Sequence, residues 1–574
     1  MGTKVLFDYC EVTDIKDMLK KSGKKYGDRI AFKIRANEPG KYIEITHKEV
    51  REMVDALGTS LINLGLKGKR IAVIGENRYE WEVGYLSVVA GTGIIVPLDK
   101  ALPENELERL IMRSGVEAIF YTNKYEEMLK RIVKKTDNNL KHLISMDLDK
   151  GIEGIFSQKE LIEKGEKLIS EGDRSFIDAK IDAEAMSIML FTSGTTSEAK
   201  AVMLSQKNIV SNLMDITKVL DISCEDRMLS FLPIHHVFEC TAGFMLSLYL
   251  GIRTSFCDGA RYLVQNMNEY ETTFMVCVPA VYEVIYKNIM KSLEKKGKLE
   301  DIKKAIELTK NSSMEEKRQV FKEIHQILGG HVRFLVSGAA ALDPEVEKGF
   351  RDFGFNLVQG YGLTESSPAV CVTTAAKHKL GSIGEALPSV EIKLDNVNEE
   401  GIGELMAKGP NVMLGYYGNE EATKEAITED GWLHTGDLCR IDEDGFVFVA
   451  GRKKSVIVLK NGKNIFPEEM ETIVNKIEGV KESFIFGKQQ SDDKDDIKIN
   501  VKIVYDKEIM KEAYKIDESG IYKVISNKIK EINKTMPLYK AIRGIIITEE
   551  PLIKTTTNKI KRKENLEIIE NENV

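Results

Sequence analysis

The sequence predicts an α/β fold: a large N-terminal domain of several subdomains, with mixed and parallel sheets packed by helices, precedes a small α+β C-terminal domain. Short runs rich in β-branched residues at 70–75, 117–121, 275–278 and 333–336 indicate buried strands. Segments with a helical spacing of apolar residues separate these runs, an alternation typical of parallel sheets. After residue 454 the pattern changes, which indicates a second, smaller unit.

Length and composition indicate a globular protein with room for large buried pockets. The chain has 574 residues, of which 43% are hydrophobic and 30% charged. The formal net charge is -8 and the basic residues are spread out, which argues against nucleic acid as a partner. The two longest apolar stretches, 84–98 and 237–252, are interrupted and fall short of the ~20 clean residues of a membrane span, so we expect both in the core.

The N-terminal residues and the cysteines favour a cytoplasmic protein. Residues 1–20 lack the basic and then apolar order of a signal peptide and carry Asp8, Glu11, Asp14 and Asp17 instead. The seven cysteines are odd in number and widely spaced, mostly within apolar runs. We therefore expect buried free thiols in a reducing compartment.

Within the large domain, the stretch 286–329 is charged, has helical periodicity and carries no strand signal. This pattern predicts a solvent-facing helical insertion. The predicted domains are residues 1–452 and 453–574.

In the C-terminal domain the sequence predicts a turn at Asn461 and Gly462, a helix from Pro467, and strands near 483–486, 497–505 and 543–548. The basic segment 559–563 and the acidic tail after it are expected to be solvated.

The segment 191–200 reads FTSGTTSEAK and follows an apolar run. A loop of small hydroxylated residues around a glycine exposes backbone N–H groups and hydroxyls to a polyphosphate, and a lysine adds a positive charge. The alternative is an ordinary Ser/Thr-rich turn, and the Walker spacing is absent. By itself this segment therefore does not establish a phosphate site.

Four further motifs follow in order: QGYGLTE at 359–365, WLHTGD at 432–437, GR at 451–452 and KTTTNK at 554–559. The ordered set resembles the adenylate-forming superfamily of acyl-CoA synthetases, luciferases and peptide-synthetase adenylation domains, over nearly the whole chain.

A finer resemblance, to long-chain fatty acyl-CoA synthetases, rests on the segments 76–81, 232–239, 278–283 and 459–467, and the helical insertion fits that subgroup.

The resemblance implies a ligase that uses ATP and Mg²⁺ to convert a fatty acid to acyl-AMP and then transfers the acyl group to coenzyme A. The implied phosphate ligands of ATP are Thr192, Ser193, Gly194, Thr195, Thr196 and Lys200. The implied ligands of its adenosine part are Gly338, Ala339 and Tyr361 at adenine, and Asp437 and Arg452 at the ribose.

The remaining implied roles concern catalysis and movement. Glu365 would bind Mg²⁺, Thr364 the α-phosphate, and Lys559 both the carboxylate and that phosphate. His236 would border the acyl carboxylate. The C-terminal domain would be mobile, turning about the hinge residue Lys454 to present Asn461 and Gly462 to CoA.

The sequence departs from the family pattern in the phosphate loop and after it, where Ser197, Ala199, Ala201 and Gln206 replace the usual residues. Their effect on activity is left open. Two alternatives also stay open: a fatty acyl-AMP ligase that loads a carrier protein, and a non-catalytic sensor of acyl nucleotides. Acyl length, oligomeric state and peripheral membrane contact are not decided by the sequence.

Overall fold

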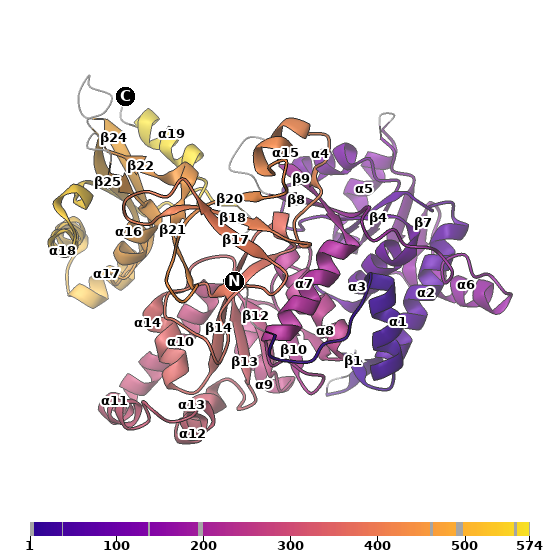
Figure 1. Cartoon of the computed structure of the whole chain (residues 1–574), viewed down its shortest axis with the longest axis horizontal. Helices are drawn as coiled ribbons and strands as arrows, with labels where there is room; N and C mark the ends of the chain where they lie inside the picture. Colours follow the sequence, from indigo (N-terminus) through magenta and orange to yellow (C-terminus); the bar gives the residue numbers. More distant parts are fainter. Residues whose placement is uncertain are drawn as a thin grey trace.

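Two large mixed β-sheets form the bulk of the described molecule, and smaller sheets complete it (Figure 1). The computed structural model describes residues 5–36, 38, 40–135, 138–192, 199–459, 463–489, 497–555 and 559–572. The α/β class predicted from the sequence is confirmed.

The first large sheet has eight strands in the order β19-β9-β8-β4-β3-β5-β6-β7. Strands β4, β3, β5, β6 and β7 run parallel, and β8 runs parallel to β4 before a hairpin reverses the chain into β9. The strands are β3 (Arg70–Ile74), β4 (Ile94–Pro97), β5 (Ala118–Tyr121), β6 (His142–Ser145), β7 (Ile155–Ser157), β8 (Met186–Thr192), β9 (Lys200–Ser205) and β19 (Gly415–Tyr416).

The second large sheet has nine strands in the order β16-β15-β14-β13-β12-β10-β11-β1-β2. Its central strands are parallel, and antiparallel strands border them. The strands are β1 (Ile30–Arg35), β2 (Tyr42–Thr46), β10 (Arg227–Ser230), β11 (Arg253–Phe256), β12 (Phe274–Cys277), β13 (Phe334–Ser337), β14 (Asn356–Gly362), β15 (Ala369–Val372) and β16 (Glu385–Ala386).

Helices pack around these sheets, as parallel strands that are buried on both faces require (Figure 1). They are α1 (Ile15–Tyr26), α2 (His47–Asn63), α3 (Tyr79–Ser87), α4 (Glu104–Ser114), α5 (Glu126–Val133), α6 (Gln158–Ser170), α7 (Gln206–Val219), α8 (Leu246–Leu250), α9 (Leu263–Glu269), α10 (Pro279–Lys295), α11 (Leu299–Leu308), α12 (Met314–Val320), α13 (Lys322–Ile327), α14 (Pro344–Asp352) and α15 (Glu420–Ala426). The predicted helical insertion is α10 to α13, and α11 and α12 bury none of their residues.

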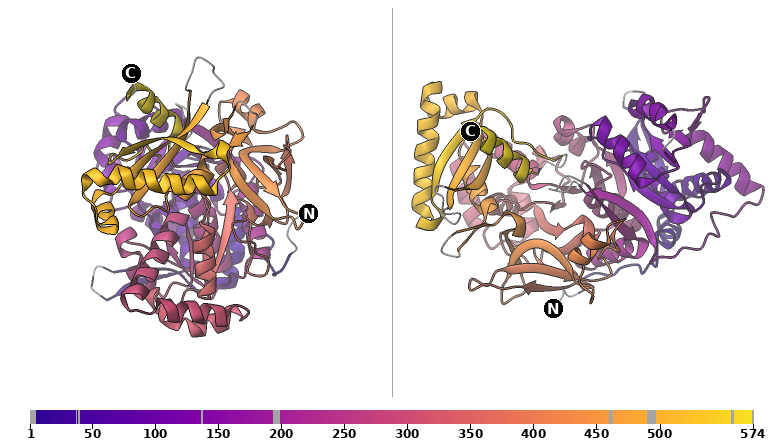
Figure 2. Two further views of the ribbon diagram at one scale, coloured as in Figure 1. Left: turned by 90° about the vertical axis from the view of Figure 1, so that its left-hand side faces the viewer. Right: turned by 90° about the horizontal axis from the view of Figure 1, so that it is seen from above.

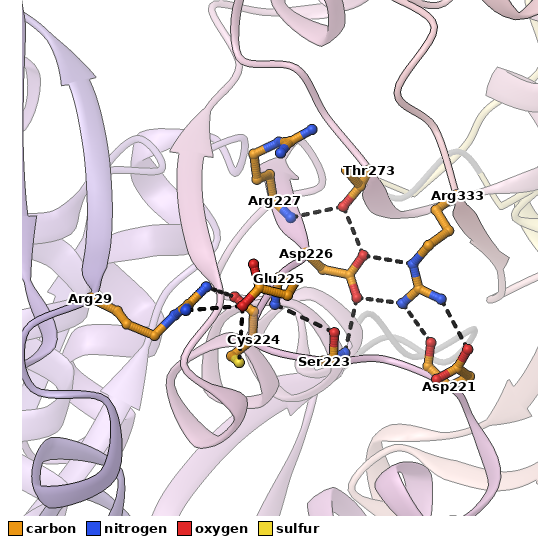
Figure 3. Close-up of polar contacts among 9 residues, drawn as sticks. All are labelled: Arg29, Asp221, Ser223, Cys224, Glu225, Asp226, Arg227, Thr273 and Arg333. Carbon is orange, nitrogen blue, oxygen red and sulfur yellow. Dashed lines mark hydrogen bonds and ion pairs between the residues drawn. The ribbon is translucent and has the colours of Figure 1, made fainter.

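A polar cluster joins the amino ends of three parallel strands of the nine-stranded sheet (Figure 3). Buried Asp226, just before β10, accepts hydrogen bonds from Thr273 before β12 and from Arg333 before β13. Arg333 also donates to the carbonyl and the carboxylate of Asp221. This cluster fixes the amino edge of the sheet, while the opposite, carboxyl edge is the usual ligand-binding edge of an α/β sheet.

A four-stranded antiparallel sheet, β17-β18-β20-β21, follows the second large sheet. Its strands are β17 (Glu391–Asp395), β18 (Gly403–Lys408), β20 (Leu433–Ile441) and β21 (Val447–Arg452). The sequence did not predict this sheet as a unit.

The C-terminal elements group at one end of the molecule (Figure 2). They are the short pair β22 (Ile457–Val458) and β23 (Asn464–Ile465), the sheet of β24 (Val480–Gln489), β25 (Ile497–Tyr505) and β26 (Ile542–Thr548), and the helices α16 (Pro467–Val474), α17 (Lys507–Tyr514), α18 (Ile521–Thr535) and α19 (Arg562–Glu572). The predicted helix from Pro467 and all three predicted strands are present.

Two expectations from the sequence are wrong in part. The tail is not simply solvated, because α19 packs against the C-terminal sheet through buried Ile569, and Arg562 pairs with Glu471 at 2.6 Å. The cysteines are all free, but Cys10, Cys224 and Cys257 are only half-buried because they lie near the surface. None of the helices in the described part of the chain has the length and apolar character that a membrane span needs.

Candidate active site

One cavity of about 2470 Å³ runs between the carboxyl edge of the nine-stranded sheet, the β8–β9 hairpin and the C-terminal elements. It is larger than the roughly 300–1,000 Å³ of a typical ligand pocket, so it has room for more than one substrate. Every predicted site residue that the structure describes lines it: Thr192, Lys200, His236, Gly338, Ala339, Tyr361, Thr364, Glu365, Asp437, Arg452, Lys454 and Lys559. Ser193, Gly194, Thr195, Thr196, Asn461 and Gly462 lie outside the described residues.

Asp437 is the centre of the most tightly bonded group in the cavity. Asp437 on β20 and Arg452 on β21 are directly opposite each other in the sheet, and the Arg452 Nε lies 2.7 Å from Asp437 Oδ1. The Tyr361 hydroxyl, from the end of β14, donates to Asp437 Oδ2 at 2.5 Å. Burial raises the pKa of Asp437, and the charge of Arg452 opposes that rise. A buried carboxylate with fixed partners is suited to accept hydrogen bonds from a pair of ligand hydroxyls.

Glu365 is held by a tyrosine that the sequence analysis missed. The Tyr416 hydroxyl donates to Glu365 Oε1 at 2.8 Å, and Lys200 Nζ lies 4.5 Å above the centre of the Tyr416 ring. Tyr416 therefore links the acidic residue of one motif to the lysine of another. Its position between Gly415 and Tyr417-Gly418 was the available signal in the sequence.

The hairpin of β8 and β9 places Thr192 and Lys200 opposite each other, at the two ends of the segment predicted to bind phosphate. The Thr192 hydroxyl donates to the Lys200 carbonyl at 3.4 Å. Arg113 of α4, which also lines the cavity, donates to the Ala199 carbonyl at 2.6 Å. The hairpin therefore aims both predicted phosphate ligands at the cavity.

Gly338 and Ala339, directly after β13, form a narrow wall. A Cβ at Gly338 would lie 2.8 Å from the ring of Phe238, so the close approach requires glycine here. Ala339 has a φ of 69°, a left-handed conformation that is uncommon for a residue other than glycine. Strained backbone that persists beside a cavity is a feature of ligand sites.

His236 lies deep in the cavity as a neutral imidazole. Burial, the neighbouring His235 and the charge of Lys559 together lower the pKa of His236 to about 4. Its Nδ1 accepts a weak hydrogen bond of 3.4 Å from the Phe238 N–H, which places the ring proton on Nε2. His235 instead faces Asp99, at 3.5 Å.

Lys559 extends from the C-terminal part into the cavity. Its backbone pairs with Thr555, which holds the two ends of the motif together. Part of the Lys559 side chain is exposed, but protein surrounds the rest and removes water from it. This desolvation and the charge of Arg452 lower the pKa of Lys559. The charges of Asp437 and Glu365 act in the opposite direction. One ammonium therefore lies within electrostatic reach of the residues predicted to bind ribose and metal.

Lys454 lies at the junction between β21 and the C-terminal elements, in a single 3₁₀ turn, Lys453–Ser455, and is exposed. Its neighbour Lys453 pairs with buried Glu404 at 2.7 Å, and His434 Nδ1 lies 3.2 Å from the same carboxylate oxygen. Asp395, Glu404 and His434 are close enough together to hold a cation. The Lys453 ammonium already balances Glu404, so this group is better explained as a polar anchor for the junction.

Glu365 fits the expected Mg²⁺ in its chemistry. Mg²⁺ usually keeps several waters and binds one or two carboxylates together with substrate phosphates. Glu365 has one oxygen held by Tyr416 and borders the same cavity as Lys200 and Thr364.

Residues 19–417 match the family described as AMP-binding enzyme, and residues 454–572 match the family described as AMP-binding enzyme C-terminal domain. Among curated proteins, the chain is 30% identical to long chain acyl-CoA synthetase 3 of Arabidopsis thaliana, with 78% of this chain and 72% of that protein covered. It is 28% identical to long-chain-fatty-acid–CoA ligase 1 of Homo sapiens, over 78% of this chain and 68% of that protein.

A third relative is a chloroplastic long-chain-fatty-acid–[acyl-carrier-protein] ligase of Arabidopsis thaliana, 26% identical over 96% of this chain and 84% of that protein. Among solved structures, the chain superimposes with a TM-score of 0.75 on ATP-bound MatB from Rhodopseudomonas palustris, covering 97% of this chain and 99% of that one at 22% identity. At that identity the likeness concerns the fold.

Proposed function

The chain belongs to the family of AMP-binding enzymes, and we propose that it is a long-chain fatty acid–CoA ligase. Its intermediate would be acyl-AMP, the mixed anhydride of the fatty acid and AMP. The observation that carries the proposal is the position of Lys559 in one cavity with Asp437, Arg452 and Glu365.

In the first half-reaction, the fatty acid carboxylate attacks the α-phosphorus of ATP, a P–O bond to the β-phosphate breaks, and pyrophosphate leaves. Thr192 and Lys200 hold the departing phosphates, together with the loop between them. Lys559 orients the carboxylate and balances the negative charge that develops at phosphorus, with Thr364 at the α-phosphate. Asp437 and Arg452 hold the ribose, and Tyr361 lies against adenine.

Mg²⁺ at Glu365 supplies charge neutralisation to the phosphate oxygens when bound. Gly338 and Ala339 form the narrow slot in which the adenine plane fits. The Phe238 ring packs so closely against Gly338 that a Cβ there would not fit. This close packing supports a slot whose width is fixed.

In the second half-reaction, the CoA thiol attacks the acyl carbon, AMP leaves, and the thiol proton must be removed. Neutral His236 borders the acyl end of the cavity and is placed to act beside this step. We propose that residues 453–574 form a mobile domain that turns about Lys454 between the two halves and presents Asn461 and Gly462 to CoA. The separate family matches that end at 417 and begin at 454 support this division.

Transfer to a carrier protein instead of CoA is the second candidate, and the ligase relative from Arabidopsis thaliana favours it. Both candidates share the adenylation step. We propose the cytoplasm as location, which the seven free cysteines support. We also propose that the protein contacts a membrane surface, because its substrates would be amphiphilic.

The test is pyrophosphate release with saturated fatty acids of increasing length, with CoA, with a carrier protein bearing phosphopantetheine, or with neither. Dependence on CoA identifies the synthetase, and dependence on the carrier protein identifies the second candidate. No release with any acid would leave the non-catalytic sensor as the better account.

A further inference from the structure

Apolar residues line the part of the cavity beside β12, from the carboxyl edge of the sheet to a short segment after α7, and this part is called the apolar branch. Its walls include Phe274 and Val276 of β12, and its far end is lined by Ile216, Leu220 and Ile222. Phe274 and Val276 are two residues apart on one strand, so both side chains face the same side of the sheet. The branch therefore follows β12 from the carboxyl edge towards the amino edge.

The branch is long enough for an extended hydrocarbon chain. Pro279, at the carboxyl edge, and Phe274, at the amino edge, both line it and are five residues apart. At about 3.3 Å per residue this spans about 16 Å, which fits on the order of a dozen carbon atoms in an extended chain.

The segment that closes the branch is thin. Leu220 and Ile222 are buried, at 4% and 7% exposure, while the Asp221 side chain between them is 64% exposed. The Ile222 N–H donates to the Leu220 carbonyl at 2.9 Å, a tight turn that directs both apolar side chains inward and Asp221 outward. One residue therefore separates the end of the branch from solvent.

The polar cluster of Figure 3 holds this thin segment in place. Arg333 Nη2 donates to the Asp221 carbonyl at 2.6 Å, while Nε and Nη2 bond to buried Asp226. Asp226 also accepts from the Ser223 N–H at 2.9 Å. The backbone on either side of Ile222 is thus tied to the sheet, so the wall cannot recede without breaking charged hydrogen bonds.

We propose that Leu220 and Ile222 are the residues that determine the maximum acyl length, and that Arg333 is the positioning residue that keeps this limit sharp. The proposal rests on the proposed function, because it concerns the acyl substrate of the same site. In a hydrophobic pocket one methylene changes specificity about 10- to 200-fold, so a rigid end wall gives an abrupt decline of activity with length.

The test measures kcat/KM for adenylation against saturated acids of increasing length for the wild type, Leu220→Ala, Ile222→Ala and Leu220→Phe. The alanine variants should accept longer acids than the wild type, with kcat/KM for those acids raised about tenfold. Leu220→Phe should lower kcat/KM for the longest substrates about tenfold. Val219→Ala is the matched control, because Val219 is equally buried beside Leu220 and does not line the cavity. Its length profile should match that of the wild type.

Arg333→Lys keeps a charge for Asp226 but lacks the fork that also reaches Asp221. We expect its activity to decline gradually with length at an unchanged KM for ATP, an effect that a loss of stability alone does not produce. Unshifted profiles in both Leu220→Ala and Leu220→Phe, with an active wild type, would overturn the inference and leave the proposed function standing. A wild type inactive on every acid would instead remove the proposed function.

Discussion

The Tyr361 hydroxyl and the Asp437 carboxylate are joined by a hydrogen bond of 2.5 Å across the cavity, between the nine-stranded and the four-stranded sheets. Arg452 occupies the other carboxylate oxygen. Both oxygens of the carboxylate are thus held by protein side chains before any ligand arrives.

Removing the charge of Asp437 should weaken nucleotide binding. Asp437→Asn keeps the size of the side chain but loses a charged acceptor worth about 1.5–3 kcal/mol, so we expect kcat/KM for ATP to fall about 10- to 100-fold. Steady-state kinetics with varied ATP measure this. The KM for the fatty acid should change little, and an unchanged kcat/KM for ATP would contradict the assignment.

Tyr416→Phe should free Glu365 and make Mg²⁺ binding less precise. The loss of one hydrogen bond to a charged group predicts a rise of the Mg²⁺ concentration for half-maximal activity by about tenfold. The matched control is Tyr417→Phe, since Tyr417 bonds to Arg70 at 2.6 Å and does not line the cavity. If both variants respond alike to Mg²⁺, Tyr416 has no special role.

Adenylation should be lost at high pH as Lys559 gives up its proton. Desolvation lowers the pKa of Lys559, so the alkaline decline should begin below the ordinary pH range of lysine deprotonation. Arginine stays protonated throughout, so Lys559→Arg should retain less activity at neutral pH but show no such decline. Pyrophosphate release measured between neutral and alkaline pH compares the wild type with Lys559→Arg. Identical pH profiles would exclude Lys559 as the titrating group.

Glu239 should make the fold less stable as pH rises. Burial raises the pKa of Glu239 to about 8, and the charge of Glu239 in turn raises the pKa of buried Glu82. The folded state therefore keeps a proton that the unfolded chain loses near pH 4.5, so the stabilisation is complete below about 4.5 and is lost as pH rises through about 8. Glu239→Gln mimics the protonated acid and should flatten this dependence. Thermal unfolding at several pH values measures it, and an equally steep profile in the variant would contradict the argument.

Much of the fold could be predicted because its signals are local. The strands β3 and β13 are short β-branched runs between helical segments, and buried parallel strands have that appearance. The four-stranded sheet was missed because strands such as β17 (Glu391–Asp395) are half-exposed and carry charges. A pattern of that kind resembles a polar loop.

The site was predicted from sequence motifs rather than from geometry, and this explains which residues the prediction omitted. Tyr416 lies 51 residues from Glu365 along the chain, and only the fold brings them together. The end wall at Leu220 and Ile222 gives no sequence signal, because two apolar residues after a helix read as core. Likewise, the contacts of Arg562 with Glu471 turned a predicted solvated tail into a packed helix.

The C-terminal elements are also tied to the rest of the molecule by charge. Lys476, after α16, lies 3.0 Å from Asp343 and 3.4 Å from Glu345 at the start of α14, and Lys287 lies 3.8 Å from Glu478. Most of these side chains are partly or largely exposed, so added salt weakens the pairs, whereas it does not screen apolar contacts. The ionic strength of the surroundings therefore acts directly on how firmly this end of the molecule is held against the rest.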